Sequence, residues 1–264
     1  MSYWLWWTHC AMEERGSATW QGASWRNVWA SDTMARTHVA LLELAATILE
    51  PLLPEIVFVG GCATALLITD PAAAPARVTY DVDVIAEIVS YPDYVAFSER
   101  LRALGLEEDT REGAPVCRWR RGEFTLDVMP LDAAILGFSN RWYPDVLRDA
   151  DELMLPSGML LRVISSPLFL ATKIEASNGR GEMDYFASRD LEDIVTVVDG
   201  RPSLANEVKR SSDDVRAYVA QAIGALLREQ RFLDAPPGYL LPDPANQARL
   251  SRLIAEFREL AGQG

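Results

Sequence analysis

The first regular pattern of apolar residues begins soon after Met34. These side chains recur at helical spacing and form one stripe, made of Leu41, Leu42, Leu44, Ile48 and Leu49. Pro51 would end such a helix, because proline lacks a backbone N–H and disfavours helical geometry in the residue before it. The pattern therefore predicts an amphipathic helix between Met34 and Pro51.

Short apolar runs alternate with helical segments from residue 56 onward. The runs expected to form strands are residues 56–61, 77–88, 116–119, 123–129 and 159–165. Helices are expected at 62–68 and at 94–104, where Gly105 marks the end. Residues 130–157 show no regular pattern and predict a loop-rich region.

Beyond Pro167 the pattern is helical throughout. Helices are expected over residues 168–177, 188–199, 208–229 and 247–260, with Gly200 in the usual role of a glycine at a helix C-terminus. The last of these helices looks exposed. The expected fold class is therefore α/β (α+β), with a mixed sheet flanked by helices in 34–165 and a helical C-terminal part in 166–264.

The first 33 residues differ from the rest of the chain. They hold six of the eight tryptophans, namely Trp4, Trp6, Trp7, Trp20, Trp25 and Trp29, without helical or strand periodicity. We interpret residues 1–33 as a poorly ordered extension, with Met34 close to the natural start. The alternative is an aromatic segment that packs onto the body of the protein.

Composition and charge narrow the function classes. The formal net charge is −13 and the sequence pI about 4.7, so the average surface repels phosphate backbones. This charge argues against a dedicated DNA- or RNA-binding module. The three cysteines are widely spaced and form no CxxC pair, which argues against a zinc site or a disulfide framework and fits a reducing cytoplasm. No apolar run approaches the roughly 20 residues that a membrane span needs.

Two carboxylates are expected side by side on the segment 77–88. Asp81 and Asp83 are two residues apart, so both leave the same face of a strand, which Thr79 shares. Neighbouring carboxylates repel each other unless a cation neutralises them, and a hard ion such as Mg²⁺ suits this pair. The alternative is an ordinary solvated strand face.

A glycine pair stands between an apolar strand and a helix. Gly60 and Gly61 would let the backbone approach a ligand closely, and the following helix N-terminus favours an anion such as a triphosphate. Taken alone, the pair is equally a tight strand-to-helix turn.

A third carboxylate lies in the run 123–129. Asp127 shares one face with Thr125 and Met129, and a carboxylate in an otherwise apolar strand needs a partner or a cation. The alternative is an exposed residue on an edge strand.

In this order, the glycine pair, the Asp-x-Asp pair and the third Asp resemble the nucleotidyltransferase superfamily. The closer resemblance is to the AbiEii-type nucleotidyltransferases, the toxin component of type IV toxin–antitoxin systems. Their Arg-x-Ser/Thr-x-Asp-x-Asp block matches Arg77–Asp83, a later helical lysine matches Lys173, and a Lys/Arg-Asp-x-x-Asp block matches Arg189–Asp193. The resemblance covers roughly residues 56–200. It departs in the long connection between Gly61 and Asp81, and in Gly-Gly where several relatives have Gly-Ser.

The resemblance implies a nucleotidyltransferase-like fold, with 34–165 as catalytic domain, and an enzyme that transfers NMP from an NTP to an acceptor. It implies that Asp81, Asp83 and Asp127 bind Mg²⁺, or Mn²⁺ as an alternative, and that Asp127 also accepts the acceptor's proton. Gly60, Gly61, Arg77, Thr79 and Lys173 would contact the nucleotide.

It further implies tRNA as acceptor, a cognate antitoxin as partner and a cytoplasmic location. Two alternatives stay open: an enzyme that modifies a small molecule of the antibiotic type, which the charge favours, and a non-catalytic nucleotide-binding scaffold.

Several other residues are open to structural explanations. The resemblance gives Asp190 a role through pairing with Lys173, whereas Asp193 is explained as an acidic residue in a first helical turn. Cys62 has no histidine partner and is expected in the core. The basic residues near the Asp127 strand, Arg118, Arg120 and Arg121, could contact substrate phosphates, but a solvated hairpin is the simpler explanation.

Overall fold

The computed structural model describes residues 33–179 and 184–263. The expected extension at 1–33 therefore lies outside the described residues, apart from Thr33, with which the first helix begins.

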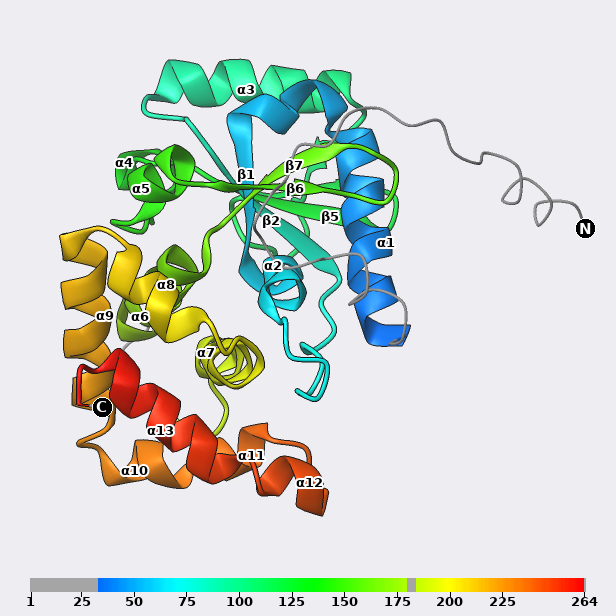
Figure 1. Cartoon of the computed structure of the whole chain (residues 1–264). Coiled ribbons are helices and arrows are strands. Elements are labelled where there is room, and N and C mark those ends of the chain that lie inside the picture. Colours follow the sequence, from blue (N-terminus) through cyan, green and yellow to red (C-terminus); the bar gives the residue numbers. More distant parts are fainter. Residues whose placement is uncertain (1–32, 180–183, 264) are drawn as a thin grey trace, which may run out of the picture.

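A mixed sheet forms the centre of the molecule (Figure 1). Its seven strands in the described residues are ordered β3-β4-β5-β2-β1-β7-β6. Their bounds are β1 Ile56–Val59, β2 Asp81–Ala86, β3 Glu107–Glu108, β4 Arg118–Arg121, β5 Phe124–Met129, β6 Asp151–Met154 and β7 Leu160–Val163. The pairs β2–β5 and β1–β7 are parallel, and the other neighbours are antiparallel. This sheet, flanked by helices, confirms the predicted fold class.

Helices precede, interrupt and follow the sheet. Those before and between the strands are α1 Thr33–Ile48, the 3-10 helix η2 Glu50–Glu55, α2 Gly60–Leu67, α3 Tyr91–Ala103, α4 Ala133–Leu136 and α5 Tyr143–Arg148. Those after the last strand are α6 Ser166–Gly179, α7 Arg189–Gly200, α8 Leu204–Arg210, α9 Asp213–Leu226, α10 Gln230–Asp234, α11 Pro236–Tyr239, α12 Pro244–Gln247 and α13 Leu250–Leu260. The predicted change from mixed structure to helices beyond Pro167 is confirmed.

One face of the sheet packs against the N-terminal helices. Strand residues with alternate spacing, such as Phe58, Val82 and Leu126, share a buried cluster with η2 and with residues of α1 and α3. Among the described side chains of α1, the buried ones are His38, Leu42, Ala45, Ala46 and Ile48, and Leu49 directly after the helix is buried too, whereas Leu44 is 47% exposed. The helix was therefore predicted correctly, but its buried stripe is turned slightly from the predicted one.

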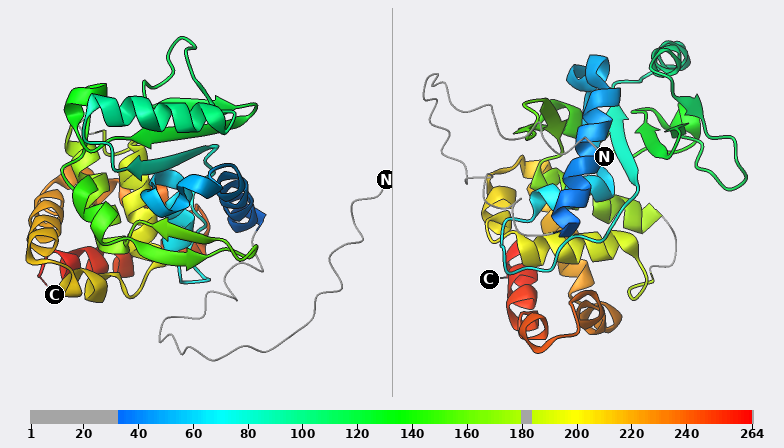
Figure 2. Two further views of the ribbon diagram at one scale, coloured as in Figure 1. Left: turned by 90° about the horizontal axis from the view of Figure 1, so that it is seen from above. Right: turned by 90° about the vertical axis from the view of Figure 1, so that its right-hand side faces the viewer.

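The opposite face packs against the C-terminal helices. Val57, Ile85 and Met129 point to this side and share a second cluster with residues of α5 to α10 and α13. Figures 1 and 2 show α8 to α13 gathered at one end of the molecule, away from α1 and α3. Helix α2 contributes to both clusters, because Ala63 lies in this one and Leu66 in the other.

The structure corrects several predicted elements before residue 165. Strand β2 begins at Asp81 rather than at residue 77, because its pairing with β5 starts there. In the segment before it Thr79 is buried and Tyr80 is 80% exposed, which departs from the expected alternation. Strand β6 lies in the region predicted as loops, and only Leu153 of its residues is buried, so no two-residue pattern marked it.

The C-terminal half also departs from the prediction. The expected helix 208–229 is two helices, because the Ser212 hydroxyl caps a new helix through the N–H of Val215. Gly200 is the last residue of α7 and has no left-handed conformation; a Cβ there would lie 2.9 Å from Ile68 Cγ2, so close packing explains it. Helix α13 is not exposed, since Leu253 and Phe257 are fully buried.

No helix in residues 33–179 and 184–263 is both long and apolar enough to cross a membrane.

Replacing Phe257 tests how strongly α13 belongs to the core. Its ring is fully buried and lies 5.3 Å from that of Phe232, edge to face. Phe257→Ala is expected to lower the free energy of unfolding by about 3–5 kcal/mol, measured by urea denaturation. The matched control, Phe186→Ala, removes a ring that is 57% exposed and should change little. A separate unfolding step for the C-terminal helices would contradict a core that these helices share with the sheet.

Candidate functional site

The register of two parallel strands brings two of the predicted carboxylates together. Asp83 on β2 lies directly opposite Asp127 on β5, and Asp81 lies opposite Thr125. All four residues face the side of the sheet that carries Ile85 and Met129, whose apolar side chains are buried further along the strands. The polar residues thus occupy one end of this face and the apolar residues the other.

Arg118 joins the carboxylates across the strands. It lies opposite Asp127 in the β4–β5 pair. Its Nε donates to Asp127 Oδ1 at 2.7 Å, and its Nη2 donates to Asp127 Oδ2 at 2.7 Å and to Asp81 Oδ2 at 2.8 Å. Asp81 and Asp127 therefore lie within hydrogen-bond distance of the same guanidinium nitrogen.

Thr79 fixes the orientation of Asp81. The Thr79 hydroxyl donates a hydrogen bond to Asp81 Oδ1, and its side chain is buried against Gly61. Burial by itself would raise the pKa of Asp81, but the hydrogen bonds from Thr79 and Arg118 and the charge of Arg118 together lower it. Asp81 is thereby held ionised.

The glycine pair lies against this carboxylate cluster. Gly60 has φ +69°, and a Cβ on it would overlap the carboxylate of Asp83. A Cβ on Gly61 would lie 3.2 Å from Arg77 Nη2 and 3.3 Å from Thr79 Cβ. Gly60 is required by the close approach of Asp83 and by its positive φ, and Gly61 leaves little room beside Arg77 and Thr79. The contact of both glycines with a nucleotide remains a prediction.

Asp83 differs from its neighbours in its electrostatics. Burial, followed by the negative charges of Asp81 and Asp127, raises the pKa of Asp83 from 3.8 to about 7, against the attraction of Lys173 and a backbone hydrogen bond from Gly61. Arg118 donates no hydrogen bond to Asp83 among the described contacts. Asp83 is thus the carboxylate whose ionised form the neighbouring negative charges disfavour most.

A second network lies beside the first and joins α6, α7 and the segment before β2. Lys173 Nζ lies 3.2 Å from Asp190 Oδ1 and 2.7 Å from Asp193 Oδ2. Arg77 Nε lies 3.1 Å from Asp193 Oδ1. The expected Lys173–Asp190 pair is present. Asp193 is expected from the sequence only as an acidic residue of a first helical turn, but it forms ion pairs with both Lys173 and Arg77.

The carboxylate cluster has the oxygen donors that a divalent metal ion prefers. Among residues 33–179 and 184–263, no group of three or more His, Cys, Asp or Glu side chains is already arranged as a metal site. The donor chemistry fits a hard divalent cation, because carboxylates from neighbouring strands face one another and a cation would relieve the repulsion on Asp83. The assignment of Asp81, Asp83 and Asp127 as ligands stays a prediction.

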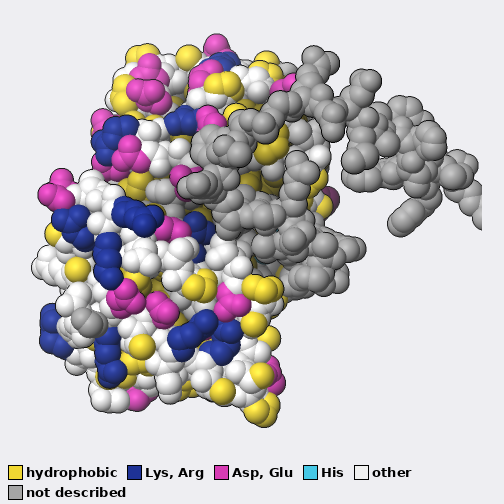
Figure 3. Space-filling model, in the orientation of Figure 1, with side chains coloured by type: hydrophobic (Ala, Val, Ile, Leu, Met, Phe, Trp, Pro, Cys, Tyr) yellow, Lys and Arg dark blue, Asp and Glu magenta, His cyan; other side chains and the backbone are white. Residues whose placement is uncertain are grey.

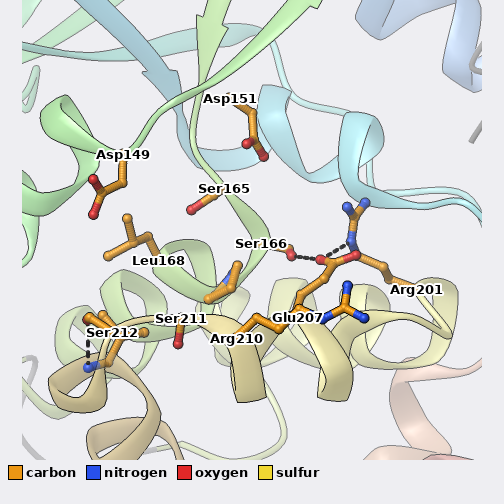
Figure 4. Close-up of a pocket in the computed structure, with 12 residues that line it drawn as sticks. Asp149, Asp151, Ser165, Ser166, Leu168, Arg201, Glu207, Arg210, Ser211 and Ser212 are labelled. Carbon is orange, nitrogen blue, oxygen red and sulfur yellow. Dashed lines mark hydrogen bonds and ion pairs between the residues drawn. The ribbon is translucent and has the colours of Figure 1, made fainter. Parts of the chain in front are cut away.

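A separate cavity of about 510 Å³ opens at the start of α6, beside α8 and α9 (Figure 4). In it the Ser166 hydroxyl donates to Glu207, which also accepts from Arg201 at 2.7 Å. Of the described residues that line it, none was predicted to carry chemistry. Concavity alone therefore does not identify the carboxylate cluster.

The sequence-based interpretation missed Arg118. Arg118 and Arg120 were explained as a solvated hairpin, whereas β4 pairs with β5 so that both face the Asp127 side. The signal was present, because residues two apart on a strand share a face and the short turn at Gly122 fixes the pairing. Cys62, by contrast, is buried as expected, and burial raises the pKa of its thiol to about 12.

Gly60 provides a steric test of this arrangement. Gly60→Ala is expected to destabilise the protein by about 1–3 kcal/mol and to displace Asp83, because the new Cβ meets that carboxylate at a left-handed φ. Thermal denaturation and a crystal structure would measure both effects. Gly113→Ala is the matched control, since Gly113 also has positive φ but nothing lies near its Cβ position. Equal losses for both variants would mean that only backbone strain matters.

The raised pKa of Asp83 predicts a pH-dependent stability in the absence of divalent cations. The unfolded carboxyl ionises near 3.8 and the folded one near 7, so the folded state holds a proton that the unfolded state has lost. Stability should therefore fall as pH rises through this window. Asp83→Asn removes this penalty. Its free energy of unfolding relative to wild type should therefore increase by about 2–4 kcal/mol as the pH rises from about 4 to about 8.

This gain would be measured by urea unfolding in EDTA at the two ends of the window. Asp214→Asn, at an exposed position of α9, is the control and should show no gain. A constant difference between wild type and Asp83→Asn at both pH values would contradict the repulsion.

Comparison with known proteins assigns the chain to no family and includes a low structural similarity. No protein-family model and no curated protein sequence matches the chain. Among solved structures, the chain is similar to an antigenic nucleotidyltransferase-like protein from Paracoccidioides brasiliensis, with a TM-score of 0.45 and 19% sequence identity. The match covers 76% of this chain and 92% of that chain. This similarity is too low to assign the chain to a family.

Proposed function

We propose that this protein is a divalent-cation-dependent nucleotidyltransferase, which transfers NMP from an NTP to an acceptor hydroxyl and releases pyrophosphate. The observation that carries the proposal is the direct pairing of Asp83 with Asp127 on neighbouring parallel strands, with the backbone of Gly60 against Asp83. Carboxylates crowded on one face in this way suit a cation bound to phosphate oxygens.

Three carboxylates would act together at the phosphate that reacts. Bound by Asp81, Asp83 and Asp127, Mg²⁺ or Mn²⁺ would neutralise charge that develops on the phosphates during in-line displacement. Asp127, which is 7% exposed, accepts the proton of the attacking hydroxyl. Thr79 holds Asp81 in a fixed orientation through its hydrogen bond.

Basic residues beside the cluster would bind the rest of the nucleotide. Lys173 carries a positive charge that already acts on Asp83, and Asp190 and Asp193 hold its ammonium group in place. Arg77 is held by the same Asp193 and fixes the segment that leads into β2. In this proposal Lys173 neutralises a phosphate, while Arg77 supports Thr79 and Asp81.

Two classes of acceptor are considered, tRNA and a small molecule. The motifs that resemble AbiEii-type toxins favour tRNA, and with it a cognate antitoxin as partner. The net charge of −13 favours the alternative, a small molecule. On the face shown in Figure 3, Lys and Arg side chains are mixed with Asp and Glu rather than joined in one basic area. A non-catalytic scaffold would bind NTP without transfer to any acceptor.

Transfer of label from α-³²P-labelled NTPs tests the proposal. With Mg²⁺ and total tRNA or a panel of hydroxylated small molecules, the wild type should label one class of acceptor. Asp83→Ala should abolish transfer, because it removes a carboxylate that the cation needs. Asp127→Asn should lower the rate roughly 10²–10⁴-fold through loss of the base.

Asp214→Asn, on the surface of α9, should leave transfer unchanged. Label that never reaches RNA would exclude the tRNA-modifying toxin, and NTP binding without transfer to any acceptor would exclude the enzyme.

A further inference from the structure

Arg118 uses the same oxygen atoms that a divalent cation would need. Both oxygens of Asp127 accept hydrogen bonds from its guanidinium, and one Nη2 atom also binds Asp81 Oδ2. A cation that binds these oxygens approaches to about 2.0–2.6 Å. The guanidinium and the cation carry like charges, so they cannot occupy this position together.

The backbone that carries Arg118 is firmly anchored. The next residue, Trp119, is 1% exposed and packs in the cluster on the other face of the sheet. The N–H of Val128 donates to the carbonyl of Cys117 at 2.9 Å, which fixes the start of β4 against β5. The Arg118 side chain, in contrast, is 22% exposed. A rotation of this side chain towards solvent would release the carboxylates without a shift of the strand.

We propose that Arg118 is an internal counter-ion, which holds Asp81 and Asp127 together until a divalent cation displaces it. This inference rests on the proposed function, because it assumes that the carboxylates bind a cation. It adds that cation binding at this site is an exchange. Without the cation, Arg118 pairs with two of the three carboxylates and offsets one of their negative charges. Removing it strengthens their repulsion and their attraction for a cation.

The neighbouring strand position offers a matched control. Arg120 lies two residues further along the same face of β4, opposite Thr125, and pairs with Glu107 instead of the carboxylate cluster. Replacing it changes the net charge of the protein equally but leaves the hydrogen bonds to Asp81 and Asp127 in place.

The experiment measures Mn²⁺ affinity of the full chain without nucleotide, by electron paramagnetic resonance of the free ion. Arg118→Gln should bind Mn²⁺ roughly tenfold tighter than wild type, as expected from the loss of charge-assisted hydrogen bonds that compete with the ion. Arg118→Lys should lie between the two, since lysine keeps the charge but not the bidentate geometry. Arg120→Gln should bind like wild type.

Unfolding in EDTA provides the second readout. Arg118→Gln should melt below wild type, and saturating Mn²⁺ should raise its Tm more than that of wild type. Equal or weaker Mn²⁺ binding by Arg118→Gln, with intact binding by wild type, would overturn the exchange but not the proposed enzyme. No Mn²⁺ binding by wild type, Arg118→Gln or Arg118→Lys would also overturn the exchange, and the transfer of label from NTP then decides separately on the enzyme.

Discussion

Repulsion among three carboxylates at one end of a sheet face is the constraint around which this structure is organised. Asp83 and Asp127 are held opposite each other by strand pairing, and Asp81 follows on the same face. Cationic groups approach from two sides, Arg118 from β4 and Lys173 from α6. Like charges this close together lower the stability of the folded state, and proteins keep such arrangements where the charges serve a function.

The two hydrophobic clusters explain how the backbone withstands this strain. Each strand that carries a carboxylate also sends apolar side chains into both clusters, as Val82 and Ile85 do on β2. Helix α2 contacts both clusters as well, so Gly60 is held in place against Asp83. Burial of apolar area therefore fixes the positions of charged groups that would otherwise move apart.

The parts of this arrangement that were predictable from the sequence depend on local spacing. The carboxylates two apart, the glycine pair after a strand and the long helices follow from patterns within a few residues. Arg118 and Asp193 were misjudged because their partners lie on other elements, which the pairing of β4 with β5 and the packing of α6 against α7 bring close. Strand β6 and the break at Ser211 were missed because they lack a strong periodic pattern.

The connection between α2 and β2 is tied down at both ends. The backbone N–H groups of Thr69 and Asp70 donate to the carbonyl of Gly200, the Asp70 carboxylate pairs with Arg249 of the C-terminal region, and Arg77 pairs with Asp193. Between these ties, the Pro71–Pro75 stretch is largely at the surface. Inserted residues in this stretch can therefore extend outward and deletions can shorten it, while the alignment of β2 beside β5 stays the same.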